Sequence, residues 1–576
     1  MRKIPCFILT LLAMVGIVSA QEERQVKIKI VETSDVHGAF FPHDFILRQP
    51  AQGSLARISS YLNQERAIYG DHLLLLDNGD ILQGQPSLYY YNYIDTTSTH
   101  LAAMVTNYLG YDAGNVGNHD VETGLTVLNR VTKSCHFPVL GANIVDTATG
   151  KPAFQPYTVF ERDGVKIAVL GLITPAIPVW LSEYLWKGWR FDDMEQAARQ
   201  WVPLIREKEQ PDVIVGIFHA GVHAETLADR YRENASVEVA KRVNGFDVVL
   251  CGHDHAPSVK QVTNDAGEQV WIVNPGSHAL QVGEVEMQFT LLNNKVKEKK
   301  ISAQLASMQH YEPDSAYLQQ FEAQVETVNQ FVNRKIGTID QTITTREAYL
   351  GSSAFVDLLH TLQLQISGAQ ISLVAPLAYD TAIPAGDICV SDMFNLYKYE
   401  NKLYTMRLTG QEVKDLLEAS YADWTIQMQS PDDHLLQIEK QRNGRYRFVN
   451  FTFNFDSAAG IQYTVDVTRP KGEKVQITTL ADGTPFDLKA DYLVAVNSYR
   501  GNGGGNLLTL GAGIPFDQLP NRIVHASELD LRYYLIKYVE EHPHLSPKPL
   551  NNWRFIPEEW VAPAAERDYK LLFGTK

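Results

Sequence analysis

The chain has 576 residues, of which 45% are hydrophobic, and its formal net charge at pH 7 is −16. A single hydrophobic core rarely serves a chain of this length, so we expect two domains. The 51 Lys and Arg residues form no basic tract. This excludes a protein that holds a nucleic-acid polymer by its phosphates, whereas a small anionic substrate held by metal is compatible with the charge.

The first twenty residues have the pattern of a secretory signal. Arg2 and Lys3 precede an apolar run over residues 4–18, and a small-residue stretch ends at Ala20. A buried first helix is the alternative, but the charged start and the polar sequence from Gln21 onward favour cleavage and export. No later segment reaches the ~20 apolar residues that span a bilayer. We therefore expect a periplasmic or secreted protein without a membrane span; the sequence gives no oligomeric state.

Apolar runs alternate with amphipathic stretches over the first half of the mature chain. Such runs, apolar on both faces and rich in β-branched residues, are typical of strands in a sheet that other layers cover. The pattern predicts an α/β domain over residues 25–305, with strands at 26–31, 72–76, 165–173, 213–218, 248–251 and 270–273.

A different composition begins near residue 310. Apolar residues at helical spacing from Leu318 to Val332 predict one connecting helix over 315–334, within a connector at 306–338. A second α/β or α+β domain is expected over 339–562. It has predicted helices at 355–365, 411–421 and 529–541, and predicted strands at 370–374, 460–467 and 492–496.

Five polar motifs of the first domain supply oxygen or nitrogen ligands just after predicted strands. In chain order they are Asp35-Val36-His37, Gly79-Asp80, Gly117-Asn118-His119-Asp120, His219 and Gly252-His253-Asp254-His255. The carboxyl ends of strands in an open α/β sheet meet at one edge, so distant stretches of chain can converge there. We expect these motifs to form one site.

The ligand types in these motifs indicate two divalent ions. Imidazole, carboxylate and amide groups without a thiolate suit Zn²⁺, Mn²⁺ or Fe²⁺, and seven such groups are too many for one tetrahedral ion. Two ions ~3.5–4 Å apart polarise a phosphoryl group, activate a bridging water and stabilise the leaving oxygen. The motifs therefore predict hydrolysis of a phosphoester.

The ordered set of motifs resembles the calcineurin-like metallophosphatase superfamily. The resemblance implies a four-layer β-sandwich flanked by helices, with His119 as the general acid or the electrostatic stabiliser of the leaving group. It also implies seven metal ligands: Asp35, His37 and His255 on one ion, Asn118, His219 and His253 on the other, and Asp80 as a bridge between the two.

A carboxylate is expected to hold the His119 imidazole in one tautomer. In the nucleotidase branch of this superfamily it stands four residues after the motif asparagine, which is Glu122 here. Asp120 is the competing candidate, and the sequence allows either.

The succession of metallophosphatase domain, connecting helix and second domain resembles the 5′-nucleotidase family, which includes 2′,3′-cyclic-nucleotide phosphodiesterases and UDP-sugar hydrolases. Members of this family clamp the base between two aromatic rings, since stacking tolerates different bases. The matching candidates are Phe455 and Tyr499, each before a loop of small residues. Core packing is the alternative for Phe455.

The second domain departs from this family at one segment. Many 5′-nucleotidases carry Asn-Gly-Gly-Gly-Ile-Arg where residues 375–380 here read Ala-Pro-Leu-Ala-Tyr-Asp, so an expected phosphate-binding arginine is absent. The pair Tyr499-Arg500 is more similar to the cyclic phosphodiesterase/3′-nucleotidase branch, and Arg500 is the candidate to replace the missing charge.

The sequence as a whole predicts an exported enzyme with two divalent metal ions and a small-molecule nucleotide substrate. The alternatives are a phosphoesterase that acts on a non-nucleotide ester or a UDP-sugar, and a metal-binding surface protein without turnover.

Overall fold

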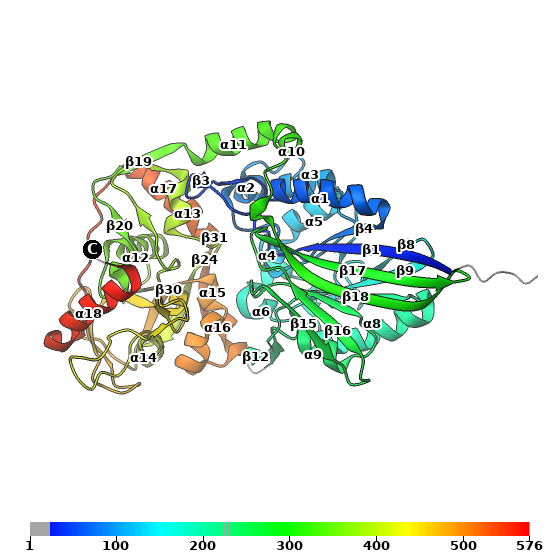
Figure 1. Ribbon diagram of the computed structural model, residues 1–576. Helices are drawn as coiled ribbons and strands as arrows, with labels where there is room; N and C mark the ends of the chain where they lie inside the picture. The colour runs from blue at the N-terminus through cyan, green and yellow to red at the C-terminus, as the bar shows by residue number, and fades with distance from the viewer. Residues whose placement is uncertain (1–22, 224–225, 228–229, 575–576) are drawn as a thin grey trace, which may run out of the picture.

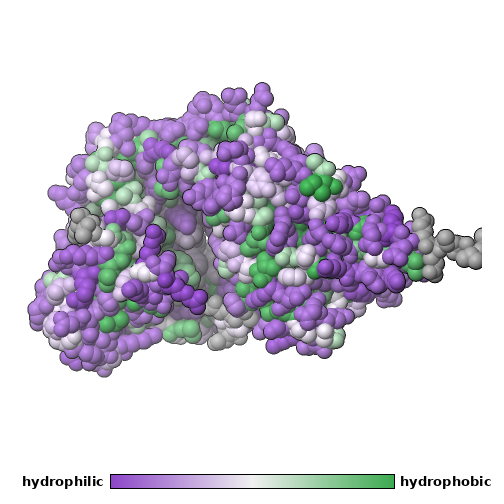
Figure 2. All heavy atoms as spheres, viewed as in Figure 1, coloured by the Kyte–Doolittle hydropathy of each residue, from purple (hydrophilic) through white to green (hydrophobic). Residues whose placement is uncertain are grey.

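The computed structural model describes residues 23–223, 226–227 and 230–574, so the predicted signal segment lies outside the described residues. Two lobes stand side by side, and helices α10 (Ser315–Gln320) and α11 (Glu322–Val332) connect them along one edge (Figure 1). A hollow lies between the lobes on the face shown in Figure 2. None of the helices within the described ranges is long and apolar enough to cross a membrane.

The first lobe contains two six-stranded sheets. The first sheet has the order β18-β17-β1-β4-β5-β6 and the second β15-β16-β14-β11-β9-β8. The strands of the first are β1 (Glu23–Thr33), β4 (Leu73–Asp77), β5 (Ala113–Asn115), β6 (Val139–Leu140), β17 (Gln281–Leu292) and β18 (Lys295–Ser307). Those of the second are β8 (Tyr157–Arg162), β9 (Val165–Ile173), β11 (Val213–His219), β14 (Val248–Cys251), β15 (Ser258–Thr263) and β16 (Gln269–Asn274). All six predicted strands are present.

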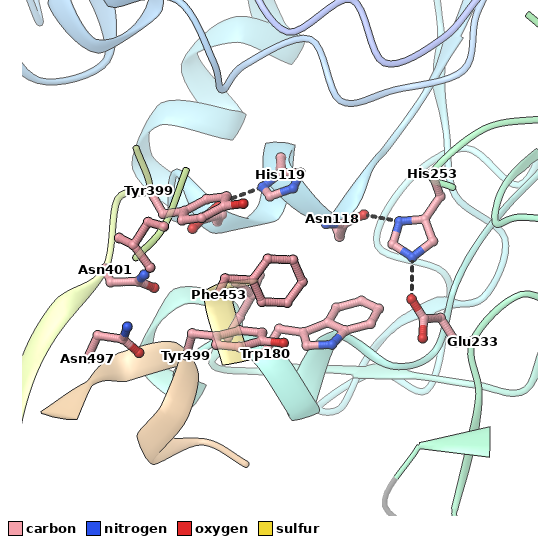
Figure 3. Close-up of a pocket in the computed structure, with 13 residues that line it drawn as sticks. Asn118, His119, Trp180, Glu233, His253, Tyr399, Asn401, Phe453, Asn497 and Tyr499 are labelled. Carbon is pink, nitrogen blue, oxygen red and sulfur yellow. Dashed lines mark hydrogen bonds and ion pairs between the residues drawn. The ribbon is translucent and has the colours of Figure 1, made fainter. Parts of the chain in front are cut away.

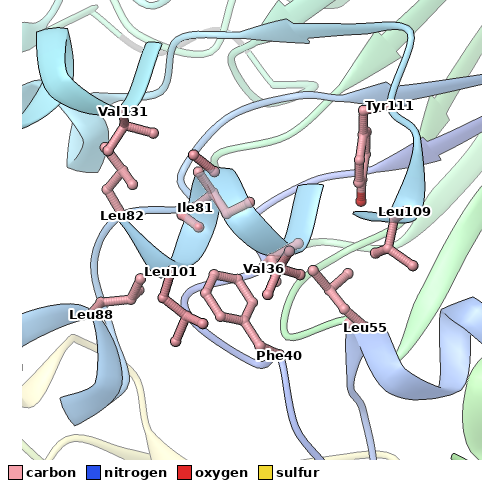
Figure 4. Close-up of a cluster of buried hydrophobic side chains, with 14 of the residues drawn as sticks. Val36, Phe40, Leu55, Ile81, Leu82, Leu88, Leu101, Leu109, Tyr111 and Val131 are labelled. Atoms are coloured by element: carbon pink, nitrogen blue, oxygen red, sulfur yellow. The ribbon is translucent and has the colours of Figure 1, made fainter. Parts of the chain in front are cut away.

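Alternation of side chains along the strands divides this lobe into layers. Ile30 and Val215 pack in the cluster shared by both sheets, whereas their neighbours Val31 and Ile214 pack in the two outer clusters. Helices α1 (Leu55–Tyr69), α3 (Leu101–Leu109) and α5 (Leu125–Ser134) cover the first sheet, and Figure 4 shows part of this outer cluster. Helices α8 (Met194–Glu209) and α9 (Ser236–Arg242) cover the second sheet. The expected four-layer fold is confirmed.

The second lobe is a mixed α/β unit around a five-stranded sheet of order β27-β21-β30-β24-β31. These strands are β21 (Ile371–Val374), β24 (Lys402–Thr409), β27 (Ser457–Ala459), β30 (Asp491–Asn497) and β31 (Ile523–Asp530). Helix α14 (Gly410–Trp424) packs on one face. Helices α12 (Ala354–Ser367), α13 (Val390–Leu396) and α17 (Leu531–Glu541) pack on the other. A separate three-stranded sheet contains the predicted strand β28 (Ile461–Asp466).

Two predictions about this half of the chain are wrong. The connector is two helices instead of one, because the backbone leaves helical geometry at Phe321 (φ −109°, ψ 14°). There the Phe321 ring is buried and lies 4.9 Å from the ring of Tyr317 in the core of the first lobe. The second lobe also extends past residue 562, since α18 (Glu558–Phe573) packs Val561 and Ala564 into its core.

Candidate active site

The predicted ligands lie at the carboxyl ends of strands or in the segments that directly follow them. Strands β1 and β4 run parallel in one sheet, and β11 and β14 run parallel in the other, so their following turns meet at one end of the first lobe. Five ligand residues that are not glycine have left-handed backbones, with φ of 51° at Asp35, 48° at His37, 57° at Asp80, 74° at His253 and 53° at His255. Such conformations cost free energy and concentrate at functional sites.

The first candidate metal group is Asp35, His37 and His255, whose ligand atoms all lie within 4.8 Å of one another. The His37 Nδ1–H donates to the Gln83 carbonyl oxygen at 2.9 Å, which leaves a lone pair on Nε2. This Nε2 lies 3.1 Å from His255 Nε2, and His255 Nε2 lies 3.2 Å from Asp35 Oδ1. Lone pairs that converge in this way fit a shared cation.

The second candidate group is Asp80, His219 and His253, and Asn118 joins it. The Asn118 Oδ1 atom lies 3.0 Å from His219 Nε2 and 2.8 Å from His253 Nδ1. Outside the group, His219 Nδ1–H donates to the Asn78 carbonyl oxygen at 2.7 Å, and His253 Nε2–H donates to Glu233 at 2.8 Å. Both imidazoles therefore direct their second nitrogen inward, as metal-ligating histidines do.

Asp80 lies between these groups and makes the centre attractive to positive charge. Its Oδ1 accepts the His119 backbone N–H at 2.7 Å, while its buried Oδ2 has no hydrogen-bond donor within the described chain and lies 3.1 Å from His219 Nε2. Burial lowers the pKa of His219, but the Asp80 charge raises it to about 10.

The turn before Asn118 comes very close to Asp80. A Cβ at Gly117 would lie 2.2 Å from Asp80 Oδ1, so glycine is needed there. The oxygen and nitrogen donors fit divalent ions of the zinc or manganese type.

Glu122, and not Asp120, contacts the His119 imidazole. The His119 Nδ1–H donates to Glu122 Oε2. The Asp120 carboxylate instead accepts backbone N–H groups of Asp80, Ile81, Leu82 and Gly117 at 2.8–3.0 Å, so it holds two ligand turns together. Burial lowers the pKa of His119, whereas Asp80 and Glu122 raise it to about 9.

A cavity of about 250 Å³ connects this centre to the second lobe. In Figure 3, Asn118, His119 and His253 lie along one side of it, and the rings of Trp180, Phe453 and Tyr499 lie along the other. The first lobe also contributes Trp180 and Glu233, and the second lobe contributes Tyr399, Asn401, Phe453, Asn497 and Tyr499. A site between two domains is a common place for a small-molecule ligand.

The structure corrects the prediction for Phe455. This ring is fully buried in the second lobe, where it stacks on Trp424 with ring centroids 5.3 Å apart and packs against Phe448. Phe453, two residues earlier, lines the cavity instead, with its centroid 6.2 Å from that of Tyr499. The sequence indicated the segment, but packing decides which of its aromatic rings enters the core.

The structure also corrects the prediction for Arg500. Its side chain is only 3% exposed. Its Nε and Nη2 donate to the Asp456 carboxylate at 2.7 and 3.1 Å, and Nη2 also donates to the Phe453 carbonyl oxygen at 3.0 Å. A guanidinium buried in this way is not free to bind a phosphate. It braces the loop that carries Phe453 beside Tyr499.

Several residues of the cavity were missed from the sequence. They are Trp180, Glu233, Tyr399, Asn401 and Asn497. Glu233 follows the short strand β13 (Tyr231–Arg232) and carries no motif, although its contact with His253 makes it part of the centre. Only the aromatic residues around position 453 gave a usable signal, because they stand before a loop of small residues.

Comparison with known proteins agrees with this geometry. Residues 28–257 match the calcineurin-like phosphoesterase family, and residues 335–511 match the 5′-nucleotidase C-terminal domain. The chain is 27% identical to the trifunctional nucleotide phosphoesterase protein YfkN of Bacillus subtilis (strain 168), across 96% of this chain and 40% of that protein. This chain thus spans less than half of that relative's length.

Two further relatives cover most of both chains. A 2′,3′-cyclic-nucleotide 2′-phosphodiesterase/3′-nucleotidase of Yersinia enterocolitica is 26% identical across 93% of this chain and 89% of its own. A crystal structure from Staphylococcus aureus, assigned to the 5′-nucleotidases, superposes with a TM-score of 0.75 at 22% identity, over 92% of this chain and 100% of its own. At that identity the superposition shows a shared fold.

Proposed function

We propose that this chain is an exported two-metal enzyme that hydrolyses nucleotides. It belongs to the calcineurin-like phosphoesterases that carry a 5′-nucleotidase C-terminal domain, and it is therefore a phosphoric ester hydrolase. One observation carries the proposal. The His119 imidazole and two of the expected metal ligands, Asn118 and His253, share a single cavity with the aromatic rings of the other lobe. A phosphate ester and a flat base fit the two ends of such a cavity.

The chemistry at the first end follows from the positions of the side chains. Two divalent ions bound there would polarise the phosphoryl group and supply a hydroxide nucleophile. The His119 Nδ1–H is held by Glu122, so Nε2 is the atom free to give a proton to the leaving oxygen. Glu122 also favours the protonated imidazole that this role requires.

The second end of the cavity is suited to a base. Phe453 and Tyr499 supply aromatic faces, and Trp180 approaches from the first lobe. The side-chain amides of Asn401 and Asn497 supply hydrogen-bond donors and acceptors at the same wall. Stacking supplies affinity for any base, while the amides can select its polar edge.

We expect 2′,3′-cyclic nucleotides and 3′-nucleotides to be better substrates than 5′-nucleotides. The segment 375–380 contains no arginine. A relative that covers nearly the whole chain is named for the cyclic phosphodiesterase and 3′-nucleotidase activities.

The proposal of export rests on the signal-like residues 1–20. It is tested by the mature N-terminus, which mass spectrometry of the native protein should place near Gln21.

The decisive experiment is a product-release assay on metal-stripped protein resupplied with Mn²⁺, Zn²⁺ or Co²⁺. Substrates are 2′,3′-cyclic AMP, 3′-AMP, 5′-AMP, UDP-glucose and p-nitrophenyl phosphate. We expect turnover only with metal, and kcat/KM for the best nucleotide at least about tenfold above that for p-nitrophenyl phosphate, since one stacked base is worth ~1–3 kcal/mol. Equal rates on all esters would favour the non-nucleotide phosphoesterase, and no turnover with any metal would favour the binding protein.

A further inference from the structure

Glu233 lies on the wall of the cavity and contacts the second candidate metal group directly. Its side chain is 16% exposed, and its Oε1 accepts the His253 Nε2–H at 2.8 Å (Figure 3). The Trp180 ring lies beside the same imidazole, with the two ring centroids 5.4 Å apart. His253 is therefore held both at its outward nitrogen and along its ring.

The carboxylate partner distinguishes His253 from the other ligand histidines. The outward nitrogens of His37 and His219 donate to backbone carbonyl oxygens at 2.9 and 2.7 Å. Among the ligand histidines of the described chain, only His253 turns its outward nitrogen to a carboxylate. A carboxylate in this position fixes the ring and strengthens the imidazole as a metal ligand. The two metal groups thus differ in the support that their ligands receive.

The residue before Glu233 anchors it to the outer helical layer. Arg232 donates from Nε and Nη2 to the Asp193 carboxylate at 3.0 and 2.6 Å, and from Nη1 to Glu195 at 2.9 Å. Asp193 caps the N-terminus of α8, and Glu195 lies in the first turn of that helix. A guanidinium bound by two parallel hydrogen bonds has a fixed orientation. The segment that carries Glu233 is therefore tied to the helix that covers the second sheet.

The residue after Glu233 ties it to the turns of the metal ligands. Asn234 Oδ1 accepts the Gly221 N–H at 2.9 Å, in the turn that follows β11. A Cβ at Gly221 would lie 2.6 Å from Asn234 Oδ1 and 2.4 Å from Asp254 Oδ2, so three segments of chain meet there without space for a side chain. Since Asp254 directly follows His253, the Glu233 carboxylate and the imidazole that it contacts are braced against each other.

We propose that Glu233 is a positioning residue, which acts through His253 to strengthen the binding of the ion in the second metal group. This inference rests on the proposed function. Asn118 and His253 of that group line the cavity, whereas no ligand of the first group is among the described residues that line it. Glu233 would therefore control the occupancy of the ion that borders the substrate cavity.

The first test measures metal binding without substrate. Metal-stripped protein is equilibrated with increasing free Mn²⁺ or Zn²⁺, and the metal bound per chain is measured. In Glu233→Ala we expect one of the two binding steps to weaken by about ten- to hundredfold, and the other to stay unchanged. Glu233→Gln, whose amide oxygen can still accept the imidazole N–H, should recover part of the loss. Binding of both ions as in the parent by Glu233→Ala would overturn the inference.

A nearby glutamate provides the matched control. Glu238 on α9 pairs with Arg232 at 3.3 Å, and within the described residues it contacts no expected ligand. Arg232 keeps its ion pair with Asp193 when Glu238 is removed. Glu238→Ala should therefore bind both ions as the parent does. If it weakens the same binding step as Glu233→Ala, the effect belongs to the fold of the segment, and the inference is overturned.

The second test separates metal binding from contact with the substrate, since Glu233 also lines the cavity. Turnover of 2′,3′-cyclic AMP by Glu233→Ala should approach that of the parent when free metal is raised about ten- to hundredfold. A deficit that persists at saturating metal would mean that the carboxylate acts on the substrate, and would overturn the positioning role. A parent that binds two ions but hydrolyses no nucleotide would contradict the proposed function alone. Unchanged metal binding by Glu233→Ala, when the parent hydrolyses nucleotides, would contradict the role of Glu233 alone.

Discussion

The two ends of the cavity are built in different ways. At the metal end, the ligands stand on tight turns after buried strands, and the sheets fix where those turns meet. At the base end, the rings stand on loops of the second lobe, and neighbouring aromatic residues compete for the core. Phe455 is buried while Phe453 lines the cavity, although only one residue separates them. Backbone topology thus determines where the metal ligands lie, whereas side-chain packing determines which aromatic rings line the base end.

The largest expected effect comes from Asp80, the carboxylate between the two metal groups. Asp80→Asn should lower turnover by on the order of a thousandfold or more and reduce metal content, because a neutral amide attracts cations weakly. Metal analysis and a rate assay measure this, with circular dichroism to verify the fold. Turnover within about tenfold of the parent would contradict the assignment of Asp80 as the bridging ligand.

His119 should behave differently, since its side chain is placed as a proton donor and not as a ligand. His119→Ala should retain its metal while kcat falls by ~10²–10⁴. Glu122→Gln should reproduce part of that loss without destabilising the protein. Asp120→Asn should instead lower metal content, because the Asp120 carboxylate holds the turns of Asp80 and Gly117. The reverse pattern would mean that the two carboxylates are assigned the wrong way round.

The base end is tested by Phe453 and Phe455 as a matched pair. Phe453→Ala should lower kcat/KM for nucleotides by about one to two decades and leave p-nitrophenyl phosphate hydrolysis nearly unchanged, because only a base can stack. Phe455→Ala should destabilise the protein by ~3–5 kcal/mol and leave the ratio of the two activities intact, since it opens a cavity in the core. Calorimetry and the activity ratio separate the two. A changed ratio in the Phe455 variant would restore the original assignment.

The smallest expected effect concerns Glu400, which joins the lobes. The Tyr93 hydroxyl donates to Glu400 at 2.9 Å, and burial, only partly offset by Arg532, raises the pKa of this carboxyl to about 7. The unfolded group ionises near ~4.5, so its contribution to stability is fully present below that pH and is lost as pH rises to 7. The melting temperature should therefore fall more between pH 5 and 8 in the parent than in Glu400→Gln. Parallel curves for the two proteins would contradict this.

The difference between the metal end and the base end of the cavity also explains how much of the site the sequence could predict. Strands such as β11 and β14 were found because short β-branched runs that are apolar on both faces are typical of buried strands, and ligand motifs stand at their carboxyl ends. Asp120 and Glu122 could not be separated, because their roles depend on which backbone N–H groups fold back onto Asp120. Arg500 next to a glycine-rich loop resembles a ligand-binding residue until its partner Asp456, distant in sequence, is known. Contacts between remote segments leave no periodic signal.

The left-handed backbone at five ligand residues destabilises the ligand turns of the metal-free protein. Each such residue costs roughly 1–2 kcal/mol, and together they approach the whole stability of an ordinary domain, about 5–15 kcal/mol. Ions that bind only the closed turns supply the free energy that holds them closed. The ligand turns of the first lobe, although Asp120 accepts several of their N–H groups, should therefore exchange amide hydrogens faster in metal-free protein than in metal-loaded protein. Metal binding would in this way complete the folding of these turns.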